Sequence, residues 1–390
     1  MSRAMADAIP TRVAPPSAPG SGASVRSRPA VLYLAGCLST TAIFIALVVV
    51  AGLRTGFRHT ARGLIELMLP GRSASVQLSK PVLRELQAMG AVIENANNPT
   101  KQPMHDTLLV RPDPMLGWTL VPNRRLEAIV LPGTSPLDLD PPVLYVPAGA
   151  QWSSALAGYI AREGRLRTSC SIDASGFRAT RPRVESDRRI LMVGDSVLFG
   201  VGVNDEATMA SQLQVLVGAA AQIVNGGVGG YSGEQAFLRA DALTATERYD
   251  ALVYVACQND FTRAHGIAYA TQAQAVLSRF RTLKPRVRGR VAVLMPTYLQ
   301  HAAADVLLGA GWPADTVRQI EALRAAMPGL AGDADLDYLD WASITAPYRK
   351  RSGTIFAPFA LYSDQAHLSP LGNQFAAQAL YAWLQLSGAI

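Results

Sequence analysis

Short apolar runs alternate with amphipathic stretches over the second half of the chain. The runs have the length and the valine, isoleucine and leucine content of strands buried in a parallel sheet. They cover residues 189–193, 222–228, 251–256, 290–295 and 336–340. Apolar residues recur at helical spacing around residues 232–246, 268–283, 314–327 and 370–386. This alternation predicts an α/β domain built on a parallel sheet.

A different pattern covers residues 31–53, where no charged residue interrupts an apolar segment. A helix that rises about 1.5 Å per residue crosses a hydrocarbon core of roughly 30 Å over this length. A helix in the core of a globular domain is usually shorter and amphipathic. We therefore predict a transmembrane helix over residues 31–53 and a single-pass membrane protein.

Composition separates the other parts of the first half. Residues 1–30 are rich in Pro, Ser, Ala, Gly and Arg, which predicts a disordered basic tail. Residues 54–106 carry apolar clusters that predict short helices within a juxtamembrane linker. Residues 107–187 are rich in Pro and Gly and contain short strand-like runs. We expect them to form a small β-rich accessory segment before the α/β domain of residues 188–390.

The chain is basic, with a formal net charge of +7. Part of this excess lies in arginines near the predicted span, where anionic lipid headgroups are the natural counter-charge. No nucleic-acid-binding motif accompanies the charge and lysine is scarce, so we do not expect nucleic acid as a partner. Cys37, Cys170 and Cys257 lack the spacing of metal ligands, so we expect neither a metal nor a cofactor. The sequence does not decide whether Cys170 and Cys257 form a disulfide.

Polar residues at the end of the first predicted strand indicate the chemistry. Residues 194–197 read Gly-Asp-Ser-Val. Gly194 permits a sharp turn, and Ser196 then lies at the carboxyl edge of the sheet, where open α/β sheets bind ligands. Taken alone, Asp195 and Ser196 are equally typical of turns and helix caps.

A serine nucleophile needs a base, and His367 is the histidine best suited to the role. Residues 364–367 read Asp-Gln-Ala-His, and Ser369 and Pro370 predict the start of the last helix. Asp364 can bind one ring nitrogen of His367 while the other faces Ser196, which fixes the tautomer and stabilises the imidazolium. The alternative is a solvated Asp and His beside a helix start.

Two further strand ends offer donors for an oxyanion. The run 222–228 is followed by Gly229 and Gly230, where a backbone N–H can approach a reacting carbonyl closely. The run 251–256 is followed by a Cys-Gln-Asn-Asp segment, in which the side-chain amide of Asn259 suits a tetrahedral oxyanion. Individually these are also ordinary loop glycines and a turn-forming Asn-Asp pair. Together with the backbone N–H of Ser196 they complete an acyl-transfer site.

In this order the segments resemble the sequence blocks of the SGNH, or GDSL, serine esterases and lipases. The blocks match Ser196, Gly230 (with Gly227 and Gly229 as other registers), Asn259, and the pair Asp364 and His367. Cys257 replaces the glycine that usually opens the third block, which could shift Asn259 or narrow the pocket. The resemblance covers residues 188–390.

The resemblance implies a flavodoxin-like three-layer α/β/α sandwich with a parallel sheet. It implies a triad of Ser196, His367 and Asp364, and an oxyanion hole made by Ser196, Gly230 and Asn259. Leu-Gly-Trp and Gly-Phe-Arg segments like residues 116–118 and 176–178 precede the serine block in a group of bacterial members. We therefore expect the accessory segment to pack beside the active site, with Trp118 either in its core or rim or lining a sugar-binding surface.

The implied function is that of a membrane-anchored esterase that hydrolyses a short acyl ester, such as acetyl on a surface polysaccharide. We expect the catalytic domain outside the cytoplasm, although equal numbers of nearby arginines precede and follow the span. An O-acyltransferase with a sugar acceptor remains open, as does a catalytically degenerate polysaccharide-binding protein. In the alginate-acetylation type of relative the Asp-His pair precedes the serine, so the opposite order here favours the esterase. The oligomeric state stays open.

Overall fold

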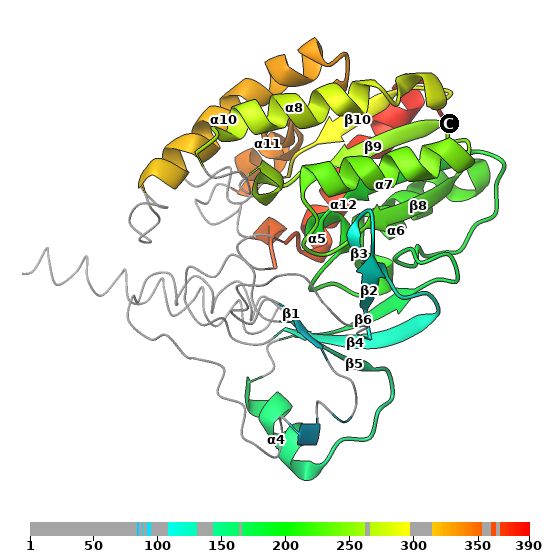
Figure 1. The fold of residues 1–390 in the computed structure, drawn as a ribbon, viewed down its shortest axis with the longest axis vertical. Coiled ribbons are helices and arrows are strands. Elements are labelled where there is room, and N and C mark those ends of the chain that lie inside the picture. The colour runs from blue at the N-terminus through cyan, green and yellow to red at the C-terminus, as the bar shows by residue number, and fades with distance from the viewer. Residues whose placement is uncertain are drawn as a thin grey trace, which may run out of the picture. The chain divides into compact units, whose positions relative to one another are not determined.

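A computed structural model describes residues 84–85, 88, 92–94, 108–130, 143–163, 166–261, 266–296, 314–352, 360–363 and 367–390. A five-stranded parallel sheet with helices around it forms the α/β region (Figure 1). The strands are β7 (Arg189–Gly194), β8 (Gln222–Gly227), β9 (Ala251–Val255), β10 (Val291–Leu294) and β11 (Asp337–Leu339). Each coincides with a predicted run. Their spatial order is β11-β10-β9-β7-β8, and neighbouring strands pair in parallel. Counted along the chain, this is the order 2-1-3-4-5 of flavodoxin-like sheets.

Helices connect these strands and cover the sheet. They are α5 (Ser196–Phe199), α6 (Met209–Val217), α7 (Gly233–Thr246), α8 (Tyr269–Arg281), α10 (Ala314–Asp333), α11 (Trp341–Ser352) and α12 (Pro370–Leu386). Short 3-10 turns are η1 (Asp205–Ala207), η2 (Gly218–Ala220), η3 (Gln258–Phe261) and η4 (Lys284–Arg286). The four predicted helices correspond to α7, α8, α10 and α12.

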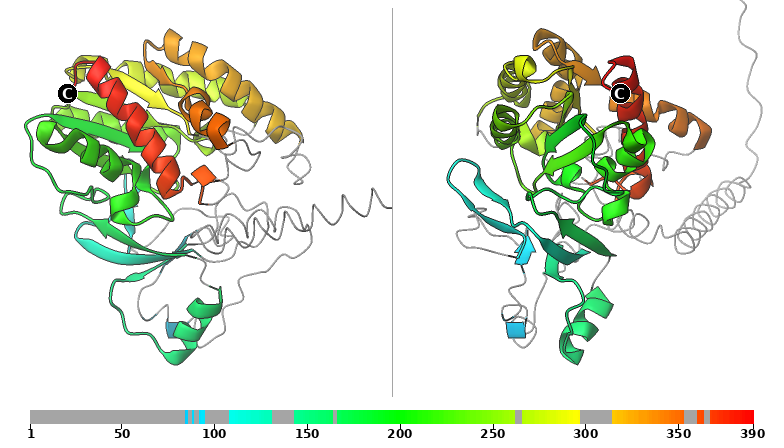
Figure 2. Two further views of the ribbon diagram at one scale, coloured as in Figure 1. Left: turned by 180° about the vertical axis from the view of Figure 1, so that it is seen from behind. Right: turned by 90° about the vertical axis from the view of Figure 1, so that its right-hand side faces the viewer.

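The sheet separates two hydrophobic cores, because successive side chains of a strand point to opposite faces. Ile190 and Met192 of β7 pack with residues of α6 and α12. Leu191 and Val193 pack with residues of α7, α8 and α10. Figure 1 shows the second group of helices in front of the sheet, and the view from behind in Figure 2 shows α12 across the other face. The predicted α/β architecture with a parallel sheet and helices on both faces is confirmed.

An antiparallel region precedes β7 in the chain. Its four-stranded sheet has the order β1-β5-β4-β6, and β2 and β3 form a separate hairpin. The bounds are β1 (Val92–Glu94), β2 (Val110–Asp113), β3 (Gly117–Leu120), β4 (Arg124–Val130), β5 (Val143–Pro147) and β6 (Leu166–Ile172), with helix α4 (Ser154–Glu163) before β6. A third core cluster combines residues of this region with Phe199, Val228 and Tyr231. The hairpin therefore packs against the segments that follow β7 and β8.

The predicted membrane location needs correction. Within the parts of the chain that the structure describes, no helix is both long enough and apolar enough to cross a bilayer. The longest of the described helices, α10, has 20 residues, and charged side chains such as Asp315 and Arg318 are exposed along it. These helices bury one face on the sheet and turn the other to water. Residues 31–53, for which the span was predicted, lie outside the described residues.

Candidate active site

Ser196 lies directly after the carboxyl end of β7, beside the point where the strand order reverses between β7 and β9. Gly194 is required there, since a Cβ atom at this position would lie 2.4 Å from the carbonyl oxygen of Val255. Asp195 caps the short helix α5, and its Oδ1 accepts a hydrogen bond of 2.9 Å from the backbone N–H of Val197. Ser196 is therefore the first residue of a tightly held helix and is 8% exposed.

His367 lies against this serine. Its Nε2 atom is 2.9 Å from Ser196 Oγ, although the two residues are 171 positions apart in the chain. His367 is 2% exposed, so the contact is shielded from water. The structure thus brings together Ser196 and His367, for which the sequence predicts the roles of nucleophile and base.

The backbone around His367 forms a small antiparallel arrangement that holds this residue against the start of α12. Ser363 N–H donates to the carbonyl oxygen of His367 at 2.8 Å, and Ser369 N–H donates to that of Leu361 at 2.9 Å. Ser369 also caps α12, as the sequence predicts, by accepting from Gly372 N–H. Asp364, the predicted partner of the His367 ring, lies outside the described residues, so its role stays a prediction.

The two predicted oxyanion donors follow the strands on either side of β7. Gly230 follows β8 in a turn with a φ of +75°, and Asn259 lies in η3 after β9. Because β7 lies between β8 and β9 and all three run in parallel, their carboxyl ends meet at one edge of the sheet. This topology brings both donors to the edge that carries Ser196. Gly227, another possible register for the glycine, is the last residue of β8 and packs against the backbone of α5.

The turn that carries Asn259 is held by a carboxylate which the sequence analysis did not single out. Asp260 Oδ2 accepts hydrogen bonds from Tyr254 Oη at 2.5 Å and from Cys257 N–H at 3.1 Å. Burial and the negative charge of Asp260 together hold the pKa of Tyr254 well above its usual value, so this phenol stays a donor. Tyr254 sits inside an apolar run, and nothing local distinguishes it from a core residue.

Cys257, which departs from the usual glycine, is buried with the apolar residues on one face of the sheet. Its side chain is accommodated by the core, and its N–H takes part in the turn just described. Cys170 and Cys257 are buried in different core clusters and are not joined to each other, so the disulfide that was left open does not form. Among the residues described, no group of three His, Cys, Asp or Glu side chains could hold a metal ion.

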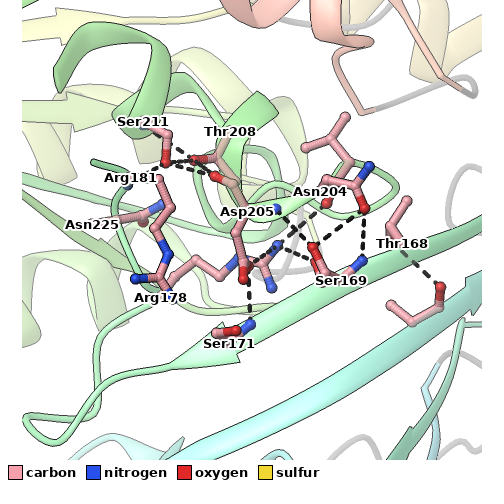
Figure 3. A network of polar contacts seen from close by, with 12 residues as sticks. Thr168, Ser169, Ser171, Arg178, Arg181, Asn204, Asp205, Thr208, Ser211 and Asn225 are labelled. Carbon is pink, nitrogen blue, oxygen red and sulfur yellow. Dashed lines mark hydrogen bonds and ion pairs between the residues drawn. The ribbon is translucent and has the colours of Figure 1, made fainter. Parts of the chain in front are cut away.

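A buried ion pair anchors the loop that follows α5 (Figure 3). Arg178 Nη2 lies 3.0 Å from Asp205 Oδ1, and both side chains are almost completely buried. The same nitrogen donates to the carbonyl oxygen of Ser169 in β6 at 3.0 Å. The guanidinium carbon lies 5.0 Å from the centroid of the Phe199 ring in α5. Arg178 ends the Gly-Phe-Arg segment, and this network explains why an arginine stands there.

Trp118 of the Leu-Gly-Trp segment is only 6% exposed. Its ring packs edge-on against Tyr231, with centroids 5.6 Å apart. A side chain this buried has no free face on which a sugar could stack. Of the two roles predicted for Trp118, the structure supports the one within the core.

Comparisons with known proteins give matches among solved structures alone. No protein-family model matches the chain, and no curated protein matches it. A carbohydrate acetylesterase family member from Sinorhizobium meliloti is similar, with 18% identity and a TM-score of 0.40 over 52% of this chain and 100% of that one. A catalytic mutant of an acetylxylan esterase from Geobacillus stearothermophilus matches with 18% identity and a TM-score of 0.40 over 53% of this chain and 96% of that one.

A member of the lipolytic G-D-S-L family from Veillonella parvula is also similar in structure to about half of this chain. It has 15% identity and a TM-score of 0.37, and the match covers 51% of this chain and 98% of that one. With identities of at most 18% and TM-scores of at most 0.40, these three matches do not assign a function to this chain.

Proposed function

We propose that this protein is a serine ester hydrolase of the SGNH type. The observation that carries the proposal is the 2.9 Å contact between Ser196 Oγ and His367 Nε2, two residues 171 positions apart. A buried hydroxyl beside an imidazole is the arrangement that activates a serine for attack on a carbonyl. The position of Ser196 at the strand-order switch of the sheet supports the same conclusion.

In the proposed mechanism His367 Nε2 accepts the hydroxyl proton as Ser196 Oγ attacks the ester carbonyl. The N–H groups of Ser196 and Gly230 and the side-chain amide of Asn259 stabilise the oxyanion. The imidazolium then gives its proton to the leaving alkoxide, and the acyl group stays on Ser196. Water, deprotonated by His367, attacks the acyl-enzyme and releases the acid. Asp364 holds the ring in the required tautomer.

We propose a short acyl ester, such as acetyl on a saccharide, as the substrate. Ser196 is 8% exposed and His367 is 2% exposed, so the attacking oxygen lies within a closed site. Such low exposure favours a small acyl group over a long acyl chain.

Labelling with a fluorophosphonate probe tests the proposal without the natural substrate. The purified protein should be labelled and should hydrolyse p-nitrophenyl acetate, whereas Ser196→Ala should do neither. His367→Gln keeps a polar side chain of similar length but cannot serve as a base, and it should lower kcat by about a thousandfold or more. Thermal unfolding would establish that both variants fold.

The alternatives predict different outcomes. A folded wild-type protein without labelling or turnover would refute the hydrolase and favour a degenerate binding protein. Acyl transfer to an added oligosaccharide that exceeds hydrolysis would identify an acyltransferase that uses the same residues.

A further inference from the structure

The hairpin of β2 and β3 contacts the segment that carries the proposed oxyanion donor Gly230. Trp118 Nε1 donates a hydrogen bond of 3.2 Å to the carbonyl oxygen of Gly229. Tyr231 Oη donates one of 2.6 Å back to the carbonyl oxygen of Trp118. Gln235 in the first turn of α7 donates to Leu116 of the same hairpin at 2.7 Å. The hairpin is thus bonded on both sides of Gly230.

Gly229 and Gly230 are the two central residues of a β-turn. The N–H of Tyr231 donates to the carbonyl oxygen of Val228 at 3.2 Å, and the N–H of Val228 donates to that of Gly194 at 3.1 Å. The φ of +75° at Gly230 is the value that a type II turn requires at its third position, about +80°. The turn is therefore tied at its first residue to Gly194 at the end of β7, two positions before Ser196.

Type I and type II turns differ chiefly by a flip of their central peptide unit. In this turn that unit joins Gly229 to Gly230, and it contains the N–H of Gly230. Two consecutive glycines place no steric barrier against either orientation. The local sequence therefore leaves open which way the proposed oxyanion donor points.

We propose that Trp118 is a positioning residue for the oxyanion hole, an inference that rests on the proposed hydrolase function. A trans peptide is planar, so its C=O and N–H point in opposite directions. When the indole N–H binds the carbonyl oxygen of Gly229, the N–H of Gly230 is turned away from the hairpin. The indole ring also covers this turn, because a Cβ atom at Gly230 would lie 3.5 Å from Trp118 Cζ2. The hairpin thereby selects the peptide orientation that the reaction uses.

Replacing Trp118 with Phe removes the donor and keeps an aromatic ring. The matched control is Thr119→Val on the same strand, which removes a hydrogen bond of equal length, 3.2 Å from Arg239 Nη1 to Thr119 Oγ1, and keeps the indole N–H of Trp118 on the carbonyl oxygen of Gly229. With p-nitrophenyl acetate as the probe, we expect Trp118→Phe to lower kcat about tenfold or more with KM within about threefold. Thr119→Val should keep kcat within about twofold of wild type.

A second variant distinguishes loss of the hydrogen bond from a folding defect in Trp118→Phe. Incorporation of β-benzothienylalanine at position 118 keeps the shape of the indole and replaces its N–H with sulfur, and it should give the same fall in kcat. If both variants match Thr119→Val while turnover still depends on Ser196, the positioning role is wrong and the hydrolase proposal stands. If wild type shows no Ser196-dependent turnover, both proposals fail.

Discussion

At the scale of single residues, two glycines allow Ser196, the proposed nucleophile, to lie close to the sheet. A Cβ atom at Gly194 would lie 2.4 Å from the carbonyl oxygen of Val255, and one at Gly227 would lie 2.5 Å from the backbone nitrogen of Phe199. Real Cβ atoms do not approach backbone atoms this closely. Helix α5 can therefore lie where it does because β8 ends in a residue without a side chain.

Gly227→Ala should displace α5 and with it Ser196. We expect a loss of about 1–3 kcal/mol in the free energy of unfolding, as for other overpacked core sites, together with a marked fall in kcat for p-nitrophenyl acetate. The matched control is Gly329→Ala in α10, where a Cβ atom meets nothing within 4 Å. That change should raise stability by roughly 0.5–1 kcal/mol, since alanine favours a helix more than glycine does. Equal behaviour of the two variants in thermal unfolding and turnover would contradict this account of Gly227.

Tyr231 gives a prediction for alkaline pH. Burial raises the pKa of its phenol from 10.0 to about 12. The folded state therefore keeps the proton in a range where the unfolded chain loses it, so this stabilisation is complete below pH 10 and disappears as the pH rises toward 12. Two pKa units correspond to at most about 2.7 kcal/mol.

Tyr231→Phe should flatten the alkaline fall in the free energy of unfolding between pH 10 and 12. At pH 7 the variant should lose about 1 kcal/mol with the hydrogen bond to Trp118. Denaturant unfolding at several pH values measures both effects. Parallel pH curves for wild type and variant would show that Tyr231 does not contribute to this dependence.

At the scale of elements, a buried ion pair and its hydrogen bonds connect β6 to the loop after α5. Asp205 accepts hydrogen bonds from the N–H of Ser171 in β6 at 3.0 Å and pairs with Arg178 at 3.0 Å. Arg178 in turn donates to the carbonyl oxygen of Val203 at 3.3 Å. Removal of one charge of a buried pair leaves the other charge buried without a partner. When one charge of an exposed pair is removed, water solvates the charge that remains.

Arg178→Met should lower the free energy of unfolding by about 3–5 kcal/mol, because it leaves the Asp205 carboxylate buried and unpaired. The double variant Arg178→Met with Asp205→Leu should recover a large part of this loss. Arg183→Met is the control, since the Arg183–Glu185 pair is exposed on both sides and should be worth less than about 1 kcal/mol. Denaturant unfolding tests this, and a double variant less stable than Arg178→Met would contradict it.

At the scale of the whole described structure, the antiparallel region and the α/β region share a core. Phe199, Val201 and Val228 are buried in one cluster with Leu116 and Trp118 of the hairpin region. Each of these apolar side chains would cost about 1.5–3 kcal/mol if it were left exposed. The two regions should therefore unfold together.

Residues 188–390 alone should be much less stable than the full chain, because Phe199, Val201 and Val228 lose their cover. Calorimetry of the full chain should show one transition that involves both regions, and the shortened chain should aggregate or unfold at a lower temperature. Two separate transitions, or a shortened chain of equal stability, would show that the shared core contributes little.

Much of the α/β region could be predicted from local pattern. The strands β7 to β11 coincide with the predicted apolar runs to within a residue or two, and α7, α8, α10 and α12 coincide with the predicted helices, because burial on one face or both imposes a period that is visible in the sequence. Helix α11 was not predicted. It contains Pro347 and several charged residues, so its apolar pattern is weak.

The residues of the candidate site also divide into those that local sequence identifies and those that only the folded structure identifies. Ser196 and His367 were identified from the residues that flank them. Asp260 and Arg178 were not, because their partners Tyr254 and Asp205 are identified only once the chain is folded. The predicted membrane location was wrong for the described part of the chain, where no helix is long and apolar enough to cross a bilayer.

The sequence by itself determined the succession of strands and helices along the chain, the turn that presents Ser196, and the type of residue at each strand end. These features depend on short-range steric and hydrophobic preferences. The tertiary structure alone decided that His367 meets Ser196 at 2.9 Å and that Trp118 binds the carbonyl oxygen of Gly229. Such contacts join residues more than 100 positions apart. They follow from the packing of whole elements, which no local pattern encodes.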